Sequence, residues 1–411
     1  MADAVLKVLA VIADLHVGGG ENRILNVARA IDPSRFRYSV ATLYPRHAGR
    51  DCEFGNMQDE FEKADIKVVN LGLRRPDTRN QMMGKLAAKA VAGPMNVVTL
   101  RRFVVEQEID LIDAHLAGAL LTAIPAAKAA GTPVVATLYH ALPGSRWSPM
   151  NALSNACLRM ADAVFTDSRI RAKELARIAG SAKPMFVIPN GVRLPPPSRS
   201  RAAMLAELGI PAHAFVIGQV SGFAPSKGHA TLLQAAKRVL SERPDSYFFC
   251  VGYTRGHSVY VESLRKEAAA LGIGDRVRFA AYPGCIADVW SLIDVHAHAS
   301  HFDSLPNAII EAMSLAKPSV VTDTGGVGEL VEHERTGLLV RPGDQESLAQ
   351  ALLRLLNDPG YARRLGRSAL QRYENHYTPE VTARAIEDSF IKVIECSHRD
   401  GRESRSVRVC N

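Results

Sequence analysis

Short β-branched runs alternate with helical patterns along this chain, and that alternation limits what it can fold into. In the first half, such runs occur at residues 6–13, 38–44, 67–72, 111–115, 133–140, 163–168 and 185–189. Amphipathic segments separate several of them, for example residues 21–31 and 116–130. Near-continuous apolar strands separated by helices predict βαβ units and a parallel sheet that is buried on both faces.

A proline-rich segment, IPNGVRLPPPSRSRA, interrupts the alternation at residues 188–202. Consecutive prolines mixed with Ser and Arg are typical of a stiff, exposed linker. After it the alternation restarts, with strands expected at residues 215–222, 246–253, 277–282, 294–300, 318–324 and 337–343. A length of 411 residues also exceeds what one compact core usually holds. We therefore predict an α/β protein with two doubly wound, Rossmann-like domains.

The expected domains cover residues 1–195 and 196–375. A helix at residues 376–397 is expected to pack back on the N-terminal domain. Residues 398–411 are charged and lack hydrophobic periodicity, so they are expected to be disordered. Because ligands of open α/β sheets bind beyond the carboxyl ends of the strands, the two domains are expected to face each other across a cleft.

The composition is that of a soluble globular protein. No run of about 18 uncharged apolar residues occurs, so no membrane-spanning segment is expected. The N-terminal residues carry acids and lack a basic region, unlike a secretory signal. Six cysteines without a C-x-x-C pair argue against a disulfide framework or a zinc site and favour a cytoplasmic location.

The net charge of +8 clusters in part between Leu71 and Phe103. The cations there are Arg74, Arg75, Arg79, Lys85, Lys89, Arg101 and Arg102, against one acid, Asp77. This cluster is either a solvated basic face or a surface for an anionic membrane or an acidic acceptor. A nucleic-acid partner is not expected, because only one aromatic residue accompanies the cluster and no recognition motif is present.

Two loops that follow the first strand of each domain are candidates for anion binding. HVGGGEN, residues 16–22, has three glycines directly before a helix, which allows close backbone approach to a ligand. The dinucleotide fingerprint fails there, because Arg23 stands at its third glycine position. In the second domain, Lys227 precedes a helix in SGFAPSKGH, residues 221–229, where a cation can pair with phosphate oxygens. Either loop is also compatible with a purely structural turn.

Two histidines end predicted strands on the side where a substrate is expected. His115 ends LIDAH and His140 ends PVVATLYH. A single histidine in such a place is more often a core residue than a catalytic one. Of the two, His140 is the better candidate, because it also leads into a turn, Ala-Leu-Pro-Gly.

The segment HFDSLPNAIIEAM, residues 301–313, carries two carboxylates, Asp303 and Glu311. Ser304 is a plausible N-cap and Pro306 is suited to a first helical turn, so a helix is expected to begin just after Asp303. The polar residues of this helix form either a solvent-facing stripe or a binding surface. Its N-terminus follows a strand and offers free N–H groups to an anion. A nucleotide diphosphate sugar fits both carboxylates, since each accepts hydrogen bonds from hydroxyls.

These residues together resemble the GT-B fold retaining glycosyltransferases of family 4, the glycosyl transferases group 1. The Glu-x7-Glu-Ala-Met motif of that family is similar to Asp303-x7-Glu311-Ala-Met here. The family's TD-x-GG-x-x-E and TGLLV-x-PGD segments appear as TDTGGVGE and TGLLVRPGD. HVGGGEN and VIPNGV extend the resemblance over nearly the whole chain.

The resemblance implies a GT-B fold and a role for each matching residue. Asp303, Glu311 and His140 are implied in catalysis: Glu311 on the donor ribose, Asp303 on a sugar hydroxyl and His140 near the sugar. Donor contacts are also implied for Lys227, for the segment Leu305, Pro306 and Asn307 through the backbone amides around it, and for the glycine loop of the acceptor domain, Gly18, Gly19 and Gly20. His115, Arg74 and Arg75 are the candidate acceptor contacts. No metal ion or other cofactor is expected, in agreement with the lack of an Asp-x-Asp motif.

The implied function is metal-independent, retaining transfer of a sugar from a nucleotide diphosphate sugar to a glycan or lipid-linked acceptor. Cell-surface polysaccharide or glycolipid synthesis at the inner face of the cytoplasmic membrane is the expected setting. Two departures bear on this function. Asp303 replaces the family's usual Glu, and Gly222 stands where the family commonly has Arg. Loss of that Arg removes roughly 1.5–3 kcal/mol of phosphate binding unless another cation, such as Arg255, replaces it.

Two alternatives remain open from the sequence. A non-catalytic GT-B subunit that binds a nucleotide or glycan is motivated by Gly222, although Lys227 and Glu311 are retained. A sugar-nucleotide epimerase on the same fold differs in forming product without an acceptor. The sequence leaves the donor sugar, the base, the acceptor, the linkage and the oligomeric state open.

Overall fold

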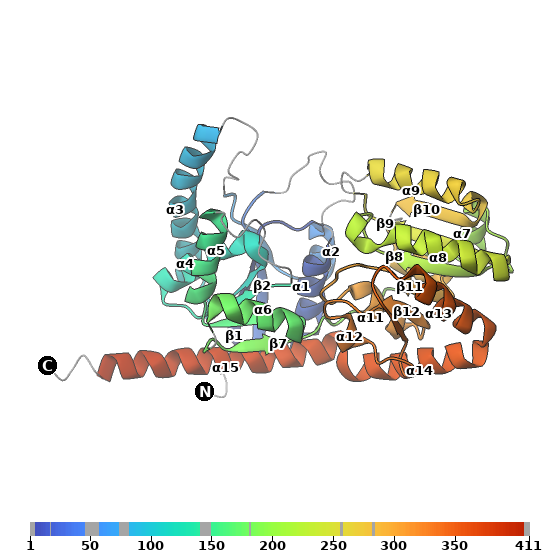
Figure 1. The fold of residues 1–411 in the computed structure, drawn as a ribbon. Coiled ribbons are helices and arrows are strands. Elements are labelled where there is room, and N and C mark those ends of the chain that lie inside the picture. The colour runs from blue at the N-terminus through green and yellow to red at the C-terminus, as the bar shows by residue number, and fades with distance from the viewer. Residues whose placement is uncertain are drawn as a thin grey trace. The chain divides into compact units, whose positions relative to one another are not determined.

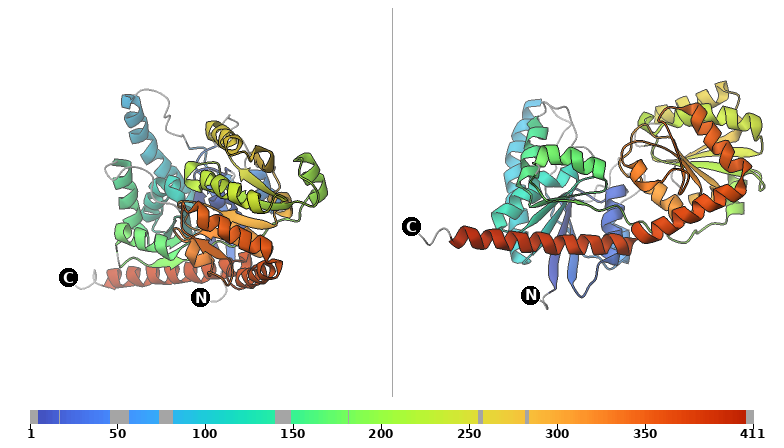
Figure 2. Two further views of the ribbon diagram at one scale, coloured as in Figure 1. Left: turned by 45° about the vertical axis from the view of Figure 1, so that its right-hand side comes forward. Right: turned by 60° about the horizontal axis from the view of Figure 1, so that its bottom comes forward.

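The computed structural model describes residues 5–16, 18–45, 57–73, 82–139, 149–180, 182–254, 258–281 and 284–406. Side chains are described in these ranges except at 82–92, 149–151 and 398–406. The chain divides into a first unit, residues 1–191 and 379–411, and a second unit, residues 192–378. Each unit is a parallel sheet with helices on both faces (Figures 1 and 2).

In the first unit, a parallel sheet of 7 strands has the order β3-β2-β1-β4-β5-β6-β7 among the described residues. The strands are β1 (Leu6–Ile12), β2 (Phe36–Thr42), β3 (Val68–Asn70), β4 (Leu111–His115), β5 (Val134–Thr137), β6 (Ala163–Thr166) and β7 (Met185–Val187). The helices are α1 (Gly19–Ala30), α2 (Gln58–Lys63), α3 (Met82–Glu106), α4 (Leu116–Ala130), α5 (Pro149–Met160), α6 (Arg169–Ala179) and α15 (Pro379–Ser406).

The apolar side chains of these strands point to both faces of the sheet, as expected for a buried parallel sheet. On one face, residues such as Leu9, Ile112 and Val134 pack with α3, α4, α5 and α6. On the other, Val8, Phe36 and Phe165 pack with Phe390 of α15, and α1 and α2 cover the neighbouring strands. The helix α15 thus packs on the sheet of the first unit.

In the second unit, the described strands form a 6-stranded parallel sheet in the order β10-β9-β8-β11-β12-β13. The strands are β8 (Phe215–Val220), β9 (Ser246–Gly252), β10 (Val277–Ala281), β11 (Val295–His298), β12 (Ser319–Thr322) and β13 (Leu338–Val340). The helices are α7 (Arg201–Glu207), α8 (His229–Glu242), α9 (Ser258–Ala270), α10 (Ile286–Leu292), α11 (Asn307–Ser314), α12 (Val327–Leu330), α13 (Gln345–Asn357) and α14 (Pro359–His376), with 3-10 turns η1 (Pro225–Lys227) and η2 (Gly274–Arg276).

The strand order of the second unit reverses between β8 and β11, because the chain moves outward from β8 to β10 and then returns to β11. In the first unit the same reversal lies between β1 and β4. Open α/β sheets bind ligands beyond the carboxyl ends of the strands at such a point. The residues that follow β8 and β11 are therefore candidates for ligand binding in the second unit.

Every strand expected from the sequence is confirmed, with ends that differ by a few residues. The C-terminal segment is a correction, because α15 continues to Ser406 where a disordered tail was expected from residue 398. Once a helix has formed, each further residue adds a backbone hydrogen bond at little cost, and no proline interrupts this segment. In the described ranges, no helix has both the length and the apolar character needed to cross a membrane.

Candidate functional site

Lys227 and Asp303 meet at the point where the strand order of the second unit reverses. Lys227 ends η1, the turn after β8, and Asp303 lies in the loop after β11. The Nζ of Lys227 donates to Oδ2 of Asp303 at 2.6 Å, and the two side chains are 27% and 15% exposed. Two residues that the sequence singled out separately, 76 positions apart, thus form one charged pair.

The Lys227 turn is fixed to the end of β11 by Gln219 and Gly228. The Gln219 amide, fully buried, donates to the Lys227 carbonyl at 2.8 Å and accepts from the Ala299 N–H at 3.3 Å. Gly228 has a φ of +67°, and a Cβ there would lie 1.8 Å from the Ala299 carbonyl oxygen. Only glycine allows this left-handed, close approach, so Gly228 is needed to bring Lys227 next to β11.

The loop that carries Asp303 is held by its neighbours in the same way. The His301 N–H donates to the Ser226 carbonyl at 2.8 Å, and the Gly326 N–H donates to the Asp303 carbonyl at 3.3 Å. Gly325, with a φ of +55°, approaches the Asp303 carbonyl so closely that a Cβ would be 1.7 Å from it. The TDTGGVGE loop therefore supports the backbone of Asp303 directly.

A second partner of Asp303, His298, is the last residue of β11. Its Nε2 lies 3.2 Å from Oδ2 of Asp303, and its side chain is 2% exposed. Burial alone would raise the pKa of Asp303, but the hydrogen bond from His298 and the charges of His298 and Lys227 hold that pKa well below its usual range. Asp303 is therefore an ionised carboxylate at neutral pH.

Glu311, in α11, is partly buried against Trp290 of α10. The Trp290 indole N–H donates to Oε2 of Glu311 at 2.7 Å. Burial raises the pKa of Glu311 to about 7, and the hydrogen bond from Trp290 opposes part of that rise. The helix therefore does not present Glu311 as part of a solvated stripe, and its carboxyl group titrates near physiological pH.

The start of α11 corrects the helix expected from the sequence. Pro306 is the N-cap residue, with φ −69° and ψ 124°, and helical structure begins at Asn307. Ser304 does not cap the helix and is 7% exposed, while Leu305 is 5% exposed. The hydrogen bonds of the preceding loop to the turns at Ser226 and Gly326 hold residues 301–306 outside the helix. Leu305 and Pro306 thus connect the Asp303 loop to α11, which begins at Asn307 and carries Glu311.

In the first unit, the glycine loop lies at the equivalent reversal, after β1. Gly18 is the N-cap residue of α1, and Gly19 and Gly20 open the helix. A Cβ at Gly20 would lie 3.3 Å from a methyl group of Leu116, so the start of α1 is packed closely on the start of α4. Arg23, one turn later, is 2% exposed and donates to the carbonyl of Ile188 at 2.8 Å and to Oδ1 of Asn190 at 2.6 Å. The HVGGGEN and VIPNGV segments are therefore joined inside the unit.

His115, at the end of β4, belongs to a buried polar cluster. Its Nδ1 lies 3.1 Å from the Tyr139 hydroxyl and its Nε2 lies 2.9 Å from Oδ2 of Asp113. The residue is 2% exposed, and the Arg23 guanidinium lies 5.1 Å from the centre of the Tyr139 ring. This placement favours a structural role for His115 over the acceptor contact expected from the sequence. His140, Arg74, Arg75 and Arg255 lie outside the described residues.

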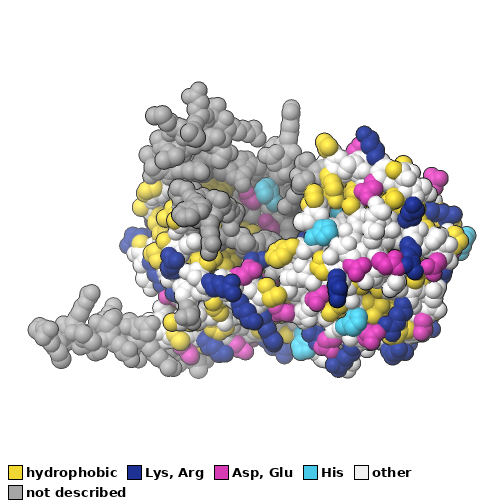
Figure 3. Space-filling view, in the orientation of Figure 1, with side chains coloured by type: hydrophobic (Ala, Val, Ile, Leu, Met, Phe, Trp, Pro, Cys, Tyr) yellow, Lys and Arg dark blue, Asp and Glu magenta, His cyan; other side chains and the backbone are white. Residues whose placement is uncertain are grey.

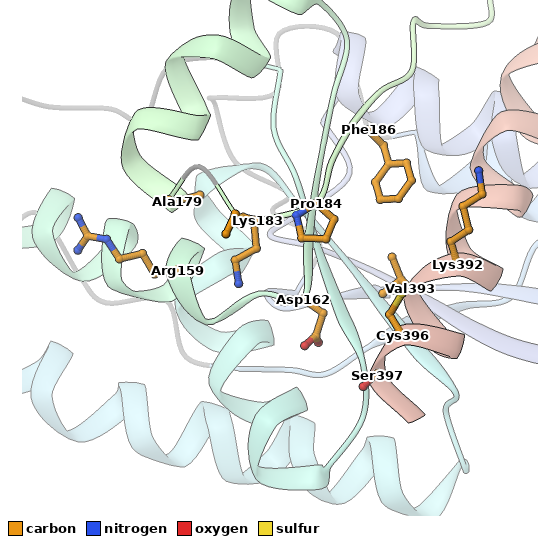
Figure 4. A pocket seen from close by; sticks show the side chains of 12 residues that line it. Arg159, Asp162, Ala179, Lys183, Pro184, Phe186, Lys392, Val393, Cys396 and Ser397 are labelled. Atoms are coloured by element: carbon orange, nitrogen blue, oxygen red, sulfur yellow. The ribbon is translucent and has the colours of Figure 1, made fainter. Parts of the chain in front are cut away.

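An open cavity of about 600 Å³ lies elsewhere in the first unit (Figure 4). It is bounded by the amino ends of β6 and β7, the last turns of α5 and α6, and α15. Its lining residues are Arg159, Asp162, Ala179, Gly180, Ala182, Lys183, Pro184, Phe186, Lys392, Val393, Cys396 and Ser397. Because ligands of such sheets bind at the opposite, carboxyl edge, we do not assign this cavity to the site.

Two residues of the site, His298 and Trp290, were missed in the sequence. The rule that singled out His115 and His140, a histidine at the carboxyl end of a predicted parallel strand, applies equally to His298. No comparable signal marks Trp290, because its contact with Glu311 depends on how α10 and α11 pack.

Comparison with known proteins matches both units to glycosyltransferase families. Residues 18–191 match the model of the glycosyl transferase 4-like domain, and residues 200–372 match the model of the glycosyl transferases group 1. Two doubly wound domains of these two kinds, in this order, define a GT-B glycosyltransferase. Within that class, the chain belongs to glycosyltransferase family 4.

A solved structure agrees with the fold, and curated relatives agree with the family. The Anabaena protein HepE, solved in complex with UDP and glucose, is 24% identical, with a TM-score of 0.76 over 93% of this chain and 99% of that chain. A D-inositol 3-phosphate glycosyltransferase from Streptomyces avermitilis is 30% identical over 58% of this chain and 53% of its own length. The lipopolysaccharide core biosynthesis glycosyltransferase LpsD from Rhizobium meliloti is 28% identical over 56% and 62%. The chain thus spans about half the length of the curated relatives it matches, or somewhat more.

Proposed function

We propose that this protein transfers a glycosyl group from a nucleotide diphosphate sugar to a hydroxyl of a glycan or lipid-linked acceptor, without a metal ion and with retention of the anomeric configuration. The observation that carries the proposal is the Lys227–Asp303 pair at the strand-order reversal, with Glu311 on the next helix. Nucleotide sugar as donor is supported by the UDP and UDP-glucose complexes of the similar Anabaena protein.

Each residue has a chemical task in this proposal. The Lys227 ammonium pairs with the donor phosphates and stabilises the charge that develops on the leaving diphosphate. Ionised Asp303 accepts a hydrogen bond from a hydroxyl of the donor sugar, and the Glu311 carboxylate accepts from the ribose hydroxyls. The glycine loop and His140 are assigned to the donor and the sugar by resemblance to the family.

On the face of the second unit that Figure 3 shows, individual cations and not a broad positive surface are expected to attract phosphates. On the face seen in Figure 3, its described Lys and Arg side chains are mixed with Asp and Glu. Such a mixed surface produces only a weak long-range field. Binding of a diphosphate then depends on Lys227 and on any second cation near it.

A calorimetric screen of UDP, GDP, ADP and their common sugar conjugates, each with and without EDTA, tests the proposal. We expect micromolar binding of one nucleotide class that EDTA does not weaken. Binding that disappears with EDTA would contradict the metal-independent part alone. The absence of binding by every nucleotide would contradict the donor assignment as a whole.

The glycine at position 222, where the family commonly has Arg, favours a second candidate function. This candidate is a GT-B subunit that binds a nucleotide or glycan without catalysis. The backbone of Gly222 does not need glycine, because its φ lies outside the left-handed region, and a Cβ there would be 3.8 Å from its nearest neighbour, the Tyr253 carbonyl oxygen. A Cβ therefore fits at this position without a steric clash with the described residues.

Gly222→Arg is expected to tighten nucleoside diphosphate binding, because it restores a charge-assisted phosphate contact worth about 1.5–3 kcal/mol. That gain corresponds to roughly 10–150-fold in affinity, measured by calorimetry. Gly222→Gln, of similar reach but without charge, is the control and should change affinity little. Equal affinity of the Arg variant and wild type would mean that another cation already occupies this role.

We also propose that the basic cluster between Leu71 and Phe103 docks the protein on anionic lipid. In its described part, Arg101 and Arg102 lie exposed on α3, beside Met95, Val98 and Val105, which are 66%, 63% and 52% exposed. Cations next to exposed apolar side chains are typical of helices that bind membrane surfaces.

Neutralising Arg74, Arg75, Arg101 and Arg102 to Gln should release the protein from vesicles that contain phosphatidylglycerol, because each lost cation removes about 1 kcal/mol of attraction. Sedimentation with such vesicles measures the bound fraction. Gln substitutions of Arg363 and Arg367, exposed on α14, form a control that lowers the net charge elsewhere. Unchanged sedimentation of the fourfold variant would contradict the membrane proposal.

A further inference from the structure

Two different side chains contact the Asp303 carboxylate: the Lys227 ammonium and the His298 imidazole. Both Lys227 Nζ, at 2.6 Å, and His298 Nε2, at 3.2 Å, lie against the same oxygen, Oδ2. The Lys227 side chain is 27% exposed and the His298 side chain is 2% exposed. Lys227 therefore contacts Asp303 from the solvent side, where a ligand arrives, and His298 contacts it from the protein interior.

His298 is held in place by the end of its strand. Its carbonyl accepts a hydrogen bond from the Thr322 hydroxyl of β12 at 3.2 Å, and the ring of His296 lies 6.0 Å away. Nδ1 of His298 is buried and has no hydrogen-bond partner among the described residues. Since an ionised carboxylate only accepts, Nε2 must carry the proton that is shared with Asp303.

Binding of a donor is expected to affect the two partners of Asp303 differently. The Lys227 ammonium, at the end of a flexible four-carbon stem, is assigned to the diphosphate, so part of its interaction with Asp303 is then lost. The buried His298 ring cannot reach the solvent side and stays with Asp303. With Oδ2 held by His298, Oδ1 of Asp303 is left for a sugar hydroxyl, and the rotation of the short Asp side chain is fixed.

We propose that His298 is a positioning residue that orients Asp303 toward the donor sugar while Lys227 binds the diphosphate. This inference rests on the function proposed above and adds to it the group that selects the sugar part of the donor over the nucleotide alone. It also accounts for an Asp at a position where the family usually has the longer Glu. The shorter Asp303 carboxylate lies within reach of His298, the last residue of the strand that precedes its loop.

The test compares affinities for a nucleoside diphosphate and for its sugar conjugate, taking the pair that the calorimetric screen identifies. His298→Leu removes the N–H donor and is expected to bind the nucleoside diphosphate within about threefold of wild type. Its affinity for the sugar conjugate should fall at least about tenfold, the loss of one charge-assisted hydrogen bond. His298→Gln, whose amide N–H occupies a place similar to Nε2–H, should restore most of the sugar-dependent affinity.

His296→Leu is the matched control, because His296 is equally buried on the same face of β11 but contacts Ser319 and the Trp290 ring instead of Asp303. Any change at Trp290 acts through the ribose side, which both ligands share. His296→Leu should leave the ratio of the two affinities unchanged. If His298→Leu does not fold, His298→Asn, which is too short to reach Asp303, should reproduce the change in ratio. Equal weakening of both ligands, or an unchanged ratio, in a folded His298 variant would overturn the inference alone. A wild-type protein that binds no nucleotide would overturn the proposed function and this inference with it.

Discussion

Replacing Lys227 with Met is expected to abolish most of the affinity for a nucleoside diphosphate while leaving that for the nucleoside intact. Lys227 is a cation that the sequence singles out and that lies, among the described residues, where the ends of β8 and β11 meet. Loss of its contacts with two phosphates removes on the order of 3 kcal/mol, about a hundredfold in affinity. Met retains the aliphatic stem, so packing of the η1 turn is preserved.

Lys237→Met is the control for this variant, since Lys237 is an exposed lysine on α8, close to Lys227 in sequence. It should bind nucleoside and nucleoside diphosphate as wild type does. Isothermal titration of both ligands on the three proteins gives the phosphate-dependent part of the affinity directly. If Lys227→Met binds the diphosphate normally, the donor phosphates do not lie at this turn.

The second large effect is expected from Glu311→Gln, which should lower turnover by two or more orders of magnitude without unfolding the protein. Gln keeps an oxygen that accepts the Trp290 N–H. The negative charge that the proposed function assigns to binding the ribose hydroxyls is lost. Thermal unfolding and steady-state turnover of the same preparation separate the two effects. Near-normal turnover would remove Glu311 from the donor site.

The raised pKa of Glu311 gives this variant a further signature. The folded-state pKa of Glu311 is about 7, and the ordinary value is 4.5. The contribution of Glu311 to the free energy of unfolding is therefore fully present below pH 4.5 and is lost as the pH rises to 7. Glu311→Gln should remove that part of the pH dependence. If only the ionised carboxylate binds ribose, wild-type affinity for a nucleotide sugar should rise about tenfold from pH 6 to pH 8, while the Gln variant stays flat.

The fold was predictable because its signals are local and repeated. Apolar runs such as residues 215–222 and 246–253 are read directly as buried parallel strands, and the prolines before them mark the boundary between two sheets. The start of α11 was less predictable. Ser304 and Pro306 have the residue types of a helix start, but hydrogen bonds of the preceding loop with Ser226 and Gly326 keep that loop outside the helix.

The site was predictable where its residues follow strands and unpredictable where it depends on packing. Lys227, Asp303 and Glu311 were singled out from their positions after predicted strands, and Asp303 and Glu311 also from the motif that they share. The contact of Lys227 with Asp303 and the support of Asp303 by Gly325 require two loops that are distant in sequence to meet. The pKa of Glu311 likewise depends on how deeply α11 is packed, which spacing alone does not reveal.

The most direct test of the account is the reaction itself, followed by NMR with the nucleotide sugar that the protein binds and a panel of glycan and lipid-linked acceptors. We predict release of the nucleoside diphosphate, a new glycosidic bond with the anomeric configuration of the donor, and loss of both in Glu311→Gln. Tight donor binding without product for any acceptor would contradict transfer and favour the binding subunit. A new sugar nucleotide formed without acceptor would contradict it in favour of an epimerase.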